Sequence, residues 1–235
     1  MTTQTPGQSA VQFQRQLGLS RYETAFQILH KLRAGMVRRE RDTIGREHPV
    51  EVDECYIGGE TRGEGKGTHH KAIVVGAVEV RTRQLGGKAH RRGVYAGRLR
   101  LRFIPDRSAE ALTDFVKENV AQGATVRTDG WISYLGLPKM KYRHEALVLN
   151  GEPDKAEAHL PMIHLVFSNL KTWIKGTHHS RIEPKHLQAY LNEYVFRFNR
   201  RFYPMTAFNS VLGIAARSVS PTYEQLYYGN WKHTA

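Results

Sequence analysis

The chain has 235 residues, of which 40% are hydrophobic, which is enough for one globular domain with a small appendage and excludes wholesale disorder. Lys and Arg total 35 against 22 Asp and Glu, a formal charge of +13 that is typical of proteins with polyanionic partners such as nucleic acid. A ribosomal-type or membrane-surface basic protein is the alternative. The single cysteine, Cys55, excludes a disulfide framework and any zinc site built from several thiolates.

The N-terminal part of the sequence predicts a small helical segment. Residues 1–9 are small and polar, and we expect a disordered lead there; residues 1–16 lack the apolar run of a signal peptide. Residues 10–37 show two helical patterns joined by a turn at Gly18, and Ser20 with Glu23 forms a capping box that predicts the start of the second helix. This arrangement resembles a helix-turn-helix that binds DNA through the exposed side of its second helix, with Arg21, Lys31 and Arg33 as contacts. The alternative is a helical hairpin with a solvated face.

A different pattern follows the charged stretch 38–49, which we interpret as a linker. Three β-type runs are predicted at 50–57, 72–78 and 94–104, separated by turn regions, and they form a meander. In the third run apolar residues alternate with arginines, which predicts one apolar and one basic face. The arginines are Arg98, Arg100 and Arg102.

The rest of the chain alternates less regularly between strand and helix. A helix begins at Ser108 and ends at Gly123, a strand occupies 124–128, and a weaker strand lies around 146–149. Helices are predicted at 158–175 and 184–201. The order of elements predicts an α/β fold, a mixed sheet flanked by helices.

Two aspartates are candidates for chemistry because of where they lie. Asp53 interrupts a strand otherwise suited to burial, and Asp129 ends the strand 124–128 just before Gly130. A charge inside a buried strand is costly unless a partner such as a metal compensates it, and two hard oxygen ligands can hold Mg²⁺ or Mn²⁺ against a phosphate. The alternatives are that Asp53 or Glu54 faces water and that Asp129 caps a turn with Gly130.

Four segments together carry a resemblance to a known family. They occur in the order VDECYIGG (52–59), TDGW (128–131), LKTWIKGTHH (170–179) and PKHLQAYLNEYVFRFNRR (184–201). This set is similar to bacterial insertion-sequence transposases of family fifteen-ninety-five, over about residues 10–205. The resemblance implies a ribonuclease-H-like catalytic domain, placed at 50–203, with a C-terminal extension at 204–235.

The resemblance also implies an acidic triad that binds metal and cuts DNA. Asp53 matches the first catalytic aspartate and Asp129 the second. The third position usually bears Glu, followed seven residues later by Lys; aligning Lys171 with that lysine puts His164 at the third position. Imidazole binds divalent metals, and Mn²⁺ tolerates nitrogen better than Mg²⁺. A core histidine is the alternative for His164, and Glu157, Glu183 and Glu193 are then the fallback carboxylates.

We expect clusters of basic residues to contact DNA phosphates. Besides the residues of the N-terminal segment and of the third strand, the predicted DNA contacts are Lys175, His178, His179, Arg197, Arg200 and Arg201. A zinc site at the His178-His179 pair is the alternative, but no second pair lies nearby.

These residues predict a transposase that binds the ends of its element and catalyses metal-dependent strand cleavage and 3′-hydroxyl strand transfer. Its expected cofactors are Mg²⁺ or Mn²⁺ in a two-metal site, and its partners are element ends, target DNA and further copies of itself in a homodimer or larger assembly. We expect no membrane partner, no nucleotide cofactor and a place at the nucleoid in the bacterial cytoplasm. A non-catalytic DNA-binding relic and a ribonuclease-H-type nuclease without joining activity are the alternatives. Many family members carry an N-terminal zinc ribbon that has no counterpart here, which leaves the recognition of element ends open.

Overall fold

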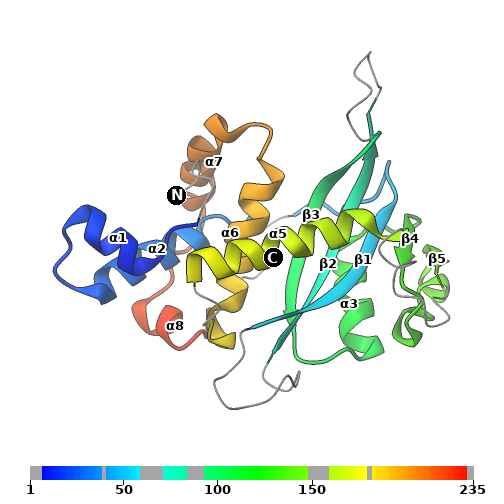
Figure 1. Cartoon of the computed structure of the whole chain (residues 1–235), viewed down its shortest axis with the longest axis horizontal. Helices are drawn as coiled ribbons and strands as arrows, with labels where there is room; N and C mark the ends of the chain where they lie inside the picture. The colour runs from blue at the N-terminus through cyan, green and yellow to red at the C-terminus, as the bar shows by residue number, and fades with distance from the viewer. Residues whose placement is uncertain are drawn as a thin grey trace. The chain divides into compact units, whose positions relative to one another are not determined.

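The computed structural model describes residues 7–38, 41–58, 71–83, 93–147, 159–178 and 182–231 (Figure 1). The chain divides into two units by its internal contacts. We call residues 42–57 and 67–169 the sheet unit, and residues 1–41, 58–66 and 170–235 the helical unit. The division falls within helix α5 (Pro161–His178). The domain boundaries expected from the sequence stay predictions.

The sheet unit is built on five strands in the order β3-β2-β1-β4-β5. The strands are β1 (Val50–Ile57), β2 (Ala72–Thr82), β3 (Val94–Ile104), β4 (Thr125–Thr128) and β5 (Arg143–Ala146). The first three form the predicted antiparallel meander, while β4 pairs in parallel with both β1 and β5. With helices packed on the sheet, this confirms the expected mixed α/β fold.

Helices lie on both faces of the sheet, and the alternation of β1 assigns each side chain to a face. Val50 and Val52 belong to a buried cluster with Phe115 of α3 (Ala109–Asn119). Glu51 and Asp53 point to the other face, where both contact the start of α5. The strand therefore presents acidic groups to one helix and valines to the other.

Close approach of α5 to the sheet depends on a glycine in β2. A Cβ added at Gly76 would lie 2.9 Å from both Ile163 Cδ1 and Phe167 Cε1. Gly76 is also the β2 partner of Asp53 in the β1–β2 ladder. The missing side chain lets the start of α5 pack next to that aspartate.

The helical unit contains the second half of α5 and the remaining helices. These are α1 (Ala10–Leu17), α2 (Tyr22–Ala34), α6 (Pro184–Asn199), α7 (Ala207–Ala215) and α8 (Tyr223–Tyr227), with the 3-10 turn η3 (Pro204–Thr206). The Nε of Arg33 in α2 donates to Oε2 of Glu193 in α6 at 2.8 Å, and both side chains are buried. Ala207 and Val211 pack with Met36 and Phe196, so α7 joins the packed core of the unit.

Two local predictions were wrong in detail. Helix α2 begins at Tyr22, with Arg21 as its N-cap and no side-chain capping bond, so the predicted box at Ser20 does not form. Gly18 ends α1 at φ 62°, and the backbone carbonyl of Ser20 accepts from Gln14, so Ser20 still belongs to the turn. Strand β5 lies at Arg143–Ala146 rather than 146–149, because Arg143 pairs with Thr125 and sets the register with β4; residues 148 and 149 lie outside the described residues. Among the described helices, none has the length and apolar character needed to cross a membrane.

Candidate functional site

The first aspartate and the candidate third residue are in direct contact. The Nε2 atom of His164 lies 3.1 Å from Oδ2 of Asp53, and the other oxygen, Oδ1, accepts the backbone N–H of Glu54 at 2.8 Å. His164 occupies the first turns of α5, and Asp53 lies in the middle of β1. The two residues are 111 positions apart in the sequence. The fold therefore brings into contact two residues that the resemblance assigns to the same catalytic site.

The second aspartate lies directly after β4, the strand next to β1. Gly130 follows it at φ 78°, a left-handed conformation that glycine adopts without strain. This turn brings the backbone N–H of Trp131 to Oδ1 of Asp129, at 3.0 Å. Burial raises the pKa of Asp129, and the negative charge of Asp53 raises it further, while the Trp131 N–H and Arg107 lower it. Asp129 directly follows β4, and Asp53 lies in the middle of β1, the neighbouring parallel strand, so the two carboxylates are electrostatic neighbours.

The side chain of Glu54, the residue after Asp53, is 3% exposed, so the alternative that Glu54 faces water is wrong. Glu54 accepts a hydrogen bond from the hydroxyl of Tyr134 at 2.7 Å and forms an ion pair with Arg107. The guanidinium of Arg107 also lies over the ring of Trp131, 4.5 Å from its centroid. Burial raises the pKa of Glu54, and the Tyr134 hydroxyl and Arg107 lower it. These contacts hold the Glu54 side chain in place next to Asp53.

Glu51 was overlooked in the sequence, and its side chain holds the start of α5. Its Oε2 accepts the backbone N–H groups of Met162 and Ile163, each at 2.8 Å, and its side chain is buried. A carboxylate at a helix N-terminus satisfies donors that have no partner within the helix and opposes the positive end of the helix dipole. His164 directly follows Ile163. By holding this first turn of α5, Glu51 therefore fixes the position of the His164 backbone relative to β1. The only signal in the sequence was the alternation of Glu51 with Val50 and Val52.

The donor set fits a divalent cation in its chemistry. Two carboxylates held close together repel each other, and a cation between them relieves this repulsion. His164 adds a nitrogen ligand, which suits Mn²⁺ better than Mg²⁺. Among the described residues, however, no group of three or more His, Cys, Asp or Glu side chains is arranged closely enough to hold a metal. The residues thus supply suitable ligands without a preformed cage.

The remaining predicted site residue, Lys171, is exposed on α5, seven residues after His164. The division of the chain passes between these two residues, so Lys171 belongs to the helical unit. Of the fallback carboxylates, Glu193 is held by Arg33 and Arg197, and Glu183 pairs with Lys185. Glu157 lies outside the described residues.

The predicted DNA contacts differ widely in exposure. Arg21, Lys31 and Lys175 are exposed, whereas Arg33 and Arg100 are buried. The arginines of β3 have protein partners: Arg98 pairs with Glu79 and Asp42, Arg100 with Asp42 and Arg102 with Glu118. In the helical unit, rings cover several others: Arg200 lies over Phe196, Arg201 over Phe198, and His178 packs on Tyr190. His179 lies outside the described residues.

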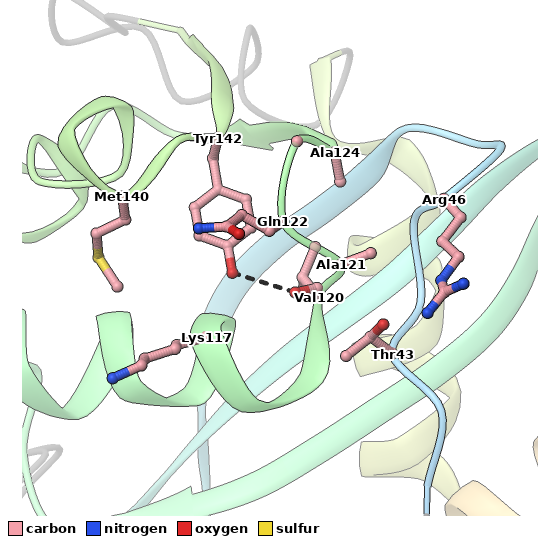
Figure 2. Close-up of a pocket in the computed structure, with 10 residues that line it drawn as sticks. Thr43, Arg46, Lys117, Val120, Ala121, Gln122, Ala124, Met140 and Tyr142 are labelled. Atoms are coloured by element: carbon pink, nitrogen blue, oxygen red, sulfur yellow. Dashed lines mark hydrogen bonds between the residues drawn. The ribbon is translucent and has the colours of Figure 1, made fainter.

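An open cavity of about 810 Å³ lies elsewhere on the sheet unit (Figure 2). It is lined by the end of α3, the loop before β4 and residues near β5, and Tyr142 donates to the carbonyl of Val120 across it. Lys117 and Arg46 line it from different elements. None of Asp53, Asp129 and His164 lines the cavity. Ala124, which lines the cavity, directly precedes β4, whereas Asp129 directly follows β4. The cavity and Asp129 therefore lie at opposite ends of that strand.

Comparison with known proteins identifies the family. The family described as the ISXO2-like transposase domain matches residues 46–199, which include all five strands, Asp53, Asp129 and His164. No curated protein and no solved structure matches the chain. The match covers well over half of the chain and agrees with the resemblance to insertion-sequence family fifteen-ninety-five and with its ribonuclease-H-like fold. The chain belongs to the ISXO2-like transposase family.

Proposed function

We propose that the chain cuts the ends of its insertion element and joins the freed 3′-hydroxyl to target DNA, with Asp53, Asp129 and His164 as its metal ligands. The observation that supports this most is the juxtaposition of Asp53, in the middle of β1, with Asp129, directly after the parallel strand β4, and with His164, which is hydrogen-bonded to Asp53. A ribonuclease-H-type nuclease and a DNA-binding relic share the fold, so joining and cutting must each be tested.

Each residue has a defined part in this proposal. Asp53 and Asp129 supply hard oxygen ligands, and His164 supplies the third ligand and orients Asp53. Mg²⁺ or Mn²⁺ held there, in a pair, would lower the pKa of water and stabilise the in-line displacement at phosphorus. Water breaks the phosphodiester and leaves a 3′-hydroxyl; that hydroxyl then attacks a target phosphodiester and releases a new 3′ end. Lys171 and the exposed cations Arg21, Lys31 and Lys175 bind phosphates and orient the duplex.

The test uses DNA that carries both ends of the element, labelled at each 3′ end. Cleavage and joining are measured with Mg²⁺ and with Mn²⁺ for the wild type and for Asp129→Asn, His164→Ala and His164→Glu. We expect Asp129→Asn and His164→Ala to lower both products at least about 100-fold. His164→Glu should raise the ratio of Mg²⁺-supported to Mn²⁺-supported cleavage, because it exchanges a nitrogen ligand for oxygen. The control is Asp114→Asn, which removes an exposed aspartate from α3.

Each other outcome identifies a different protein. Wild type that binds the ends but never cuts them is a DNA-binding relic. Cleavage without joined product, even from a pre-cut 3′-hydroxyl end, indicates a nuclease. Full activity of His164→Ala assigns the third ligand to another carboxylate.

A further inference from the structure

Three large apolar side chains are exposed to solvent immediately after Asp129. Trp131 is 43% exposed, Ile132 69% and Leu135 60%. They come from the 3-10 turn η1 (Ile132–Tyr134) and its flanks, and we call them the η1 surface. The two residues between them, Ser133 and Tyr134, are buried. The turn therefore packs one side firmly and presents an apolar side to water, which marks an interaction surface rather than loose packing.

Hydrogen bonds hold the η1 surface in place relative to Asp129. The Trp131 N–H donates to the Asp129 carboxylate, and the Trp131 carbonyl accepts the N–H of Tyr134 at 2.9 Å. The Ser133 hydroxyl donates to the carbonyl of Arg107 at 2.9 Å. A ligand on this surface would thus find its contacts already ordered, which lowers the entropy cost of binding.

The chemistry of the surface matches a single strand of nucleic acid. The Trp131 ring is flat and half exposed, and Arg107 lies against it with its side chain partly open to water. Proteins bind single strands by combining aromatic rings, on which bases stack, with nearby cations that attract phosphates. In other DNA-binding proteins, isoleucine and leucine side chains insert as wedges between base pairs, and Ile132 and Leu135 have the same chemistry. The strongly basic chain supplies the long-range attraction to DNA.

The position of the η1 surface beside Asp129 indicates that its ligand is the DNA strand that is cut there. Because the backbone N–H of Trp131 lies 3.0 Å from the carboxylate of Asp129, a DNA strand whose phosphodiester reaches Asp129 comes close to Trp131. Unstacking a base from the duplex costs free energy, and stacking it on a protein aromatic ring returns part of that cost. An aromatic surface beside the acid therefore lowers the cost of opening the duplex where it is cut.

We propose that Trp131, flanked by Ile132 and Leu135, is a stacking platform for an unpaired nucleobase of the DNA strand that is cut beside Asp129. This inference rests on the proposed cleavage function and adds to it that the duplex is melted at the cut. Trp131 binds substrate and takes no part in the chemistry itself.

The test compares two substrates with the same variants. One is the fully paired element end, and the other carries three non-complementary bases at the cut. Trp131→Ala should slow cleavage of the paired end about 10-fold or more, while Trp131→Phe retains most of the rate. On the pre-melted end, Trp131→Ala should cut within about threefold of wild type, because the cost of opening is removed. Tyr95→Ala is the matched control, since Arg83 lies 4.7 Å over the Tyr95 ring in the same unit but away from Asp129.

A second readout needs no cleavage. Complexes formed without divalent metal are treated with permanganate, which oxidises unpaired thymines. Wild type and Trp131→Phe should make a thymine at the cut reactive, and Trp131→Ala should leave it protected.

Several results would overturn the platform while leaving the cleavage function intact. Trp131→Ala could cut the paired end as fast as wild type. It could also be equally slow on both substrates, in which case Trp131 only supports Asp129. A change from dimer to monomer in Trp131→Ala, with unaltered permanganate reactivity, would assign the η1 surface to contact between copies. Wild type that fails to cut either substrate contradicts the proposed function itself.

Discussion

At the level of single residues, Glu79 is a buried carboxylate that is stabilised by two arginines and a backbone N–H. It is buried in β2, where its two oxygens accept from Arg81, from Arg98 and from the backbone N–H of Gly45. Burial alone would raise the pKa of Glu79, but the hydrogen bonds from Arg98, Gly45 and Arg81 lower it to about 2. The ionised carboxylate therefore stabilises the corner where Gly45 meets β2 and β3.

Replacing that carboxylate should cost stability in a pH-dependent way. The lowered pKa means that the stabilisation is complete above the ordinary value of 4.5 and is lost as pH falls from there towards 2. Glu79→Gln should lower the free energy of unfolding by about 3 kcal/mol at pH 7, and the difference from wild type should shrink between pH 4.5 and 2. Urea unfolding at several pH values measures it, with Glu145→Gln, an exposed glutamate paired with Arg127, as the control. A difference that stays constant across this range would contradict the assignment.

The residue scale also shows what the sequence could not reveal. The motif predicted Asp53, Asp129 and His164, and the fold brings the first and last into contact and makes Asp129 an electrostatic neighbour of Asp53. Glu51 was overlooked because its partners are backbone N–H groups 111 and 112 positions away, and such groups carry no mark in a sequence.

At the level of elements, the seating of α5 on the sheet determines where His164 lies. Gly76→Val should push Ile163 and Phe167 away, since even a Cβ would lie 2.9 Å from each. We expect a loss of about 1–3 kcal/mol in the free energy of unfolding, the usual cost of overpacking a core. Thermal or urea unfolding measures the loss. Gly136→Val is the control, because an added Cβ there meets only Thr113, at 4.0 Å.

A further outcome of the same variant links the packing to function. If α5 shifts, DNA cleavage should fall by more than the loss of folded protein explains, because His164 moves away from Asp53. Unchanged stability in Gly76→Val would show that α5 has room to adjust.

The elements themselves were largely predictable. Strands β1, β2 and β3 carry long apolar runs or strict alternation, and these patterns placed them closely. The start of α2 was misplaced because a capping box is only a local preference, and the backbone of the turn overrode it. Strand β5 has only four residues, RHEA, which have no apolar pattern, so only its pairing with β4 defines it.

At the level of the whole molecule, the formal charge of +13 predicts how DNA binding depends on salt. A protein that contacts 6–10 phosphates loses about 10³–10⁵ in affinity between 50 and 200 mM salt. Binding of the element end, measured by fluorescence anisotropy over this range, should weaken to that extent. Lys31→Ala should reduce the slope of log affinity against log salt by about 1, because it removes one exposed cation. Glu224→Gln, an exposed change on α8, should leave the slope unaltered.

Arg33, a buried arginine two residues after Lys31, should affect stability and not the salt dependence of DNA binding. Arg33→Ala leaves Glu193 with fewer partners in the interior, so it should unfold the helical unit rather than change the salt slope. Binding that does not respond to salt would contradict the phosphate contacts as a group.

The contact between Asp53 in β1 and His164 in α5 has a consequence for synthesis of the chain. The meander joins neighbours in sequence, but Asp53 meets His164 only after 111 further residues have been made. At about 5–20 residues per second, the ribosome needs roughly 5–20 s to add them. Throughout this interval the first aspartate is present without His164. A nascent transposase thus completes the contact between Asp53 and His164 late, after most of its lysines and arginines have already been translated.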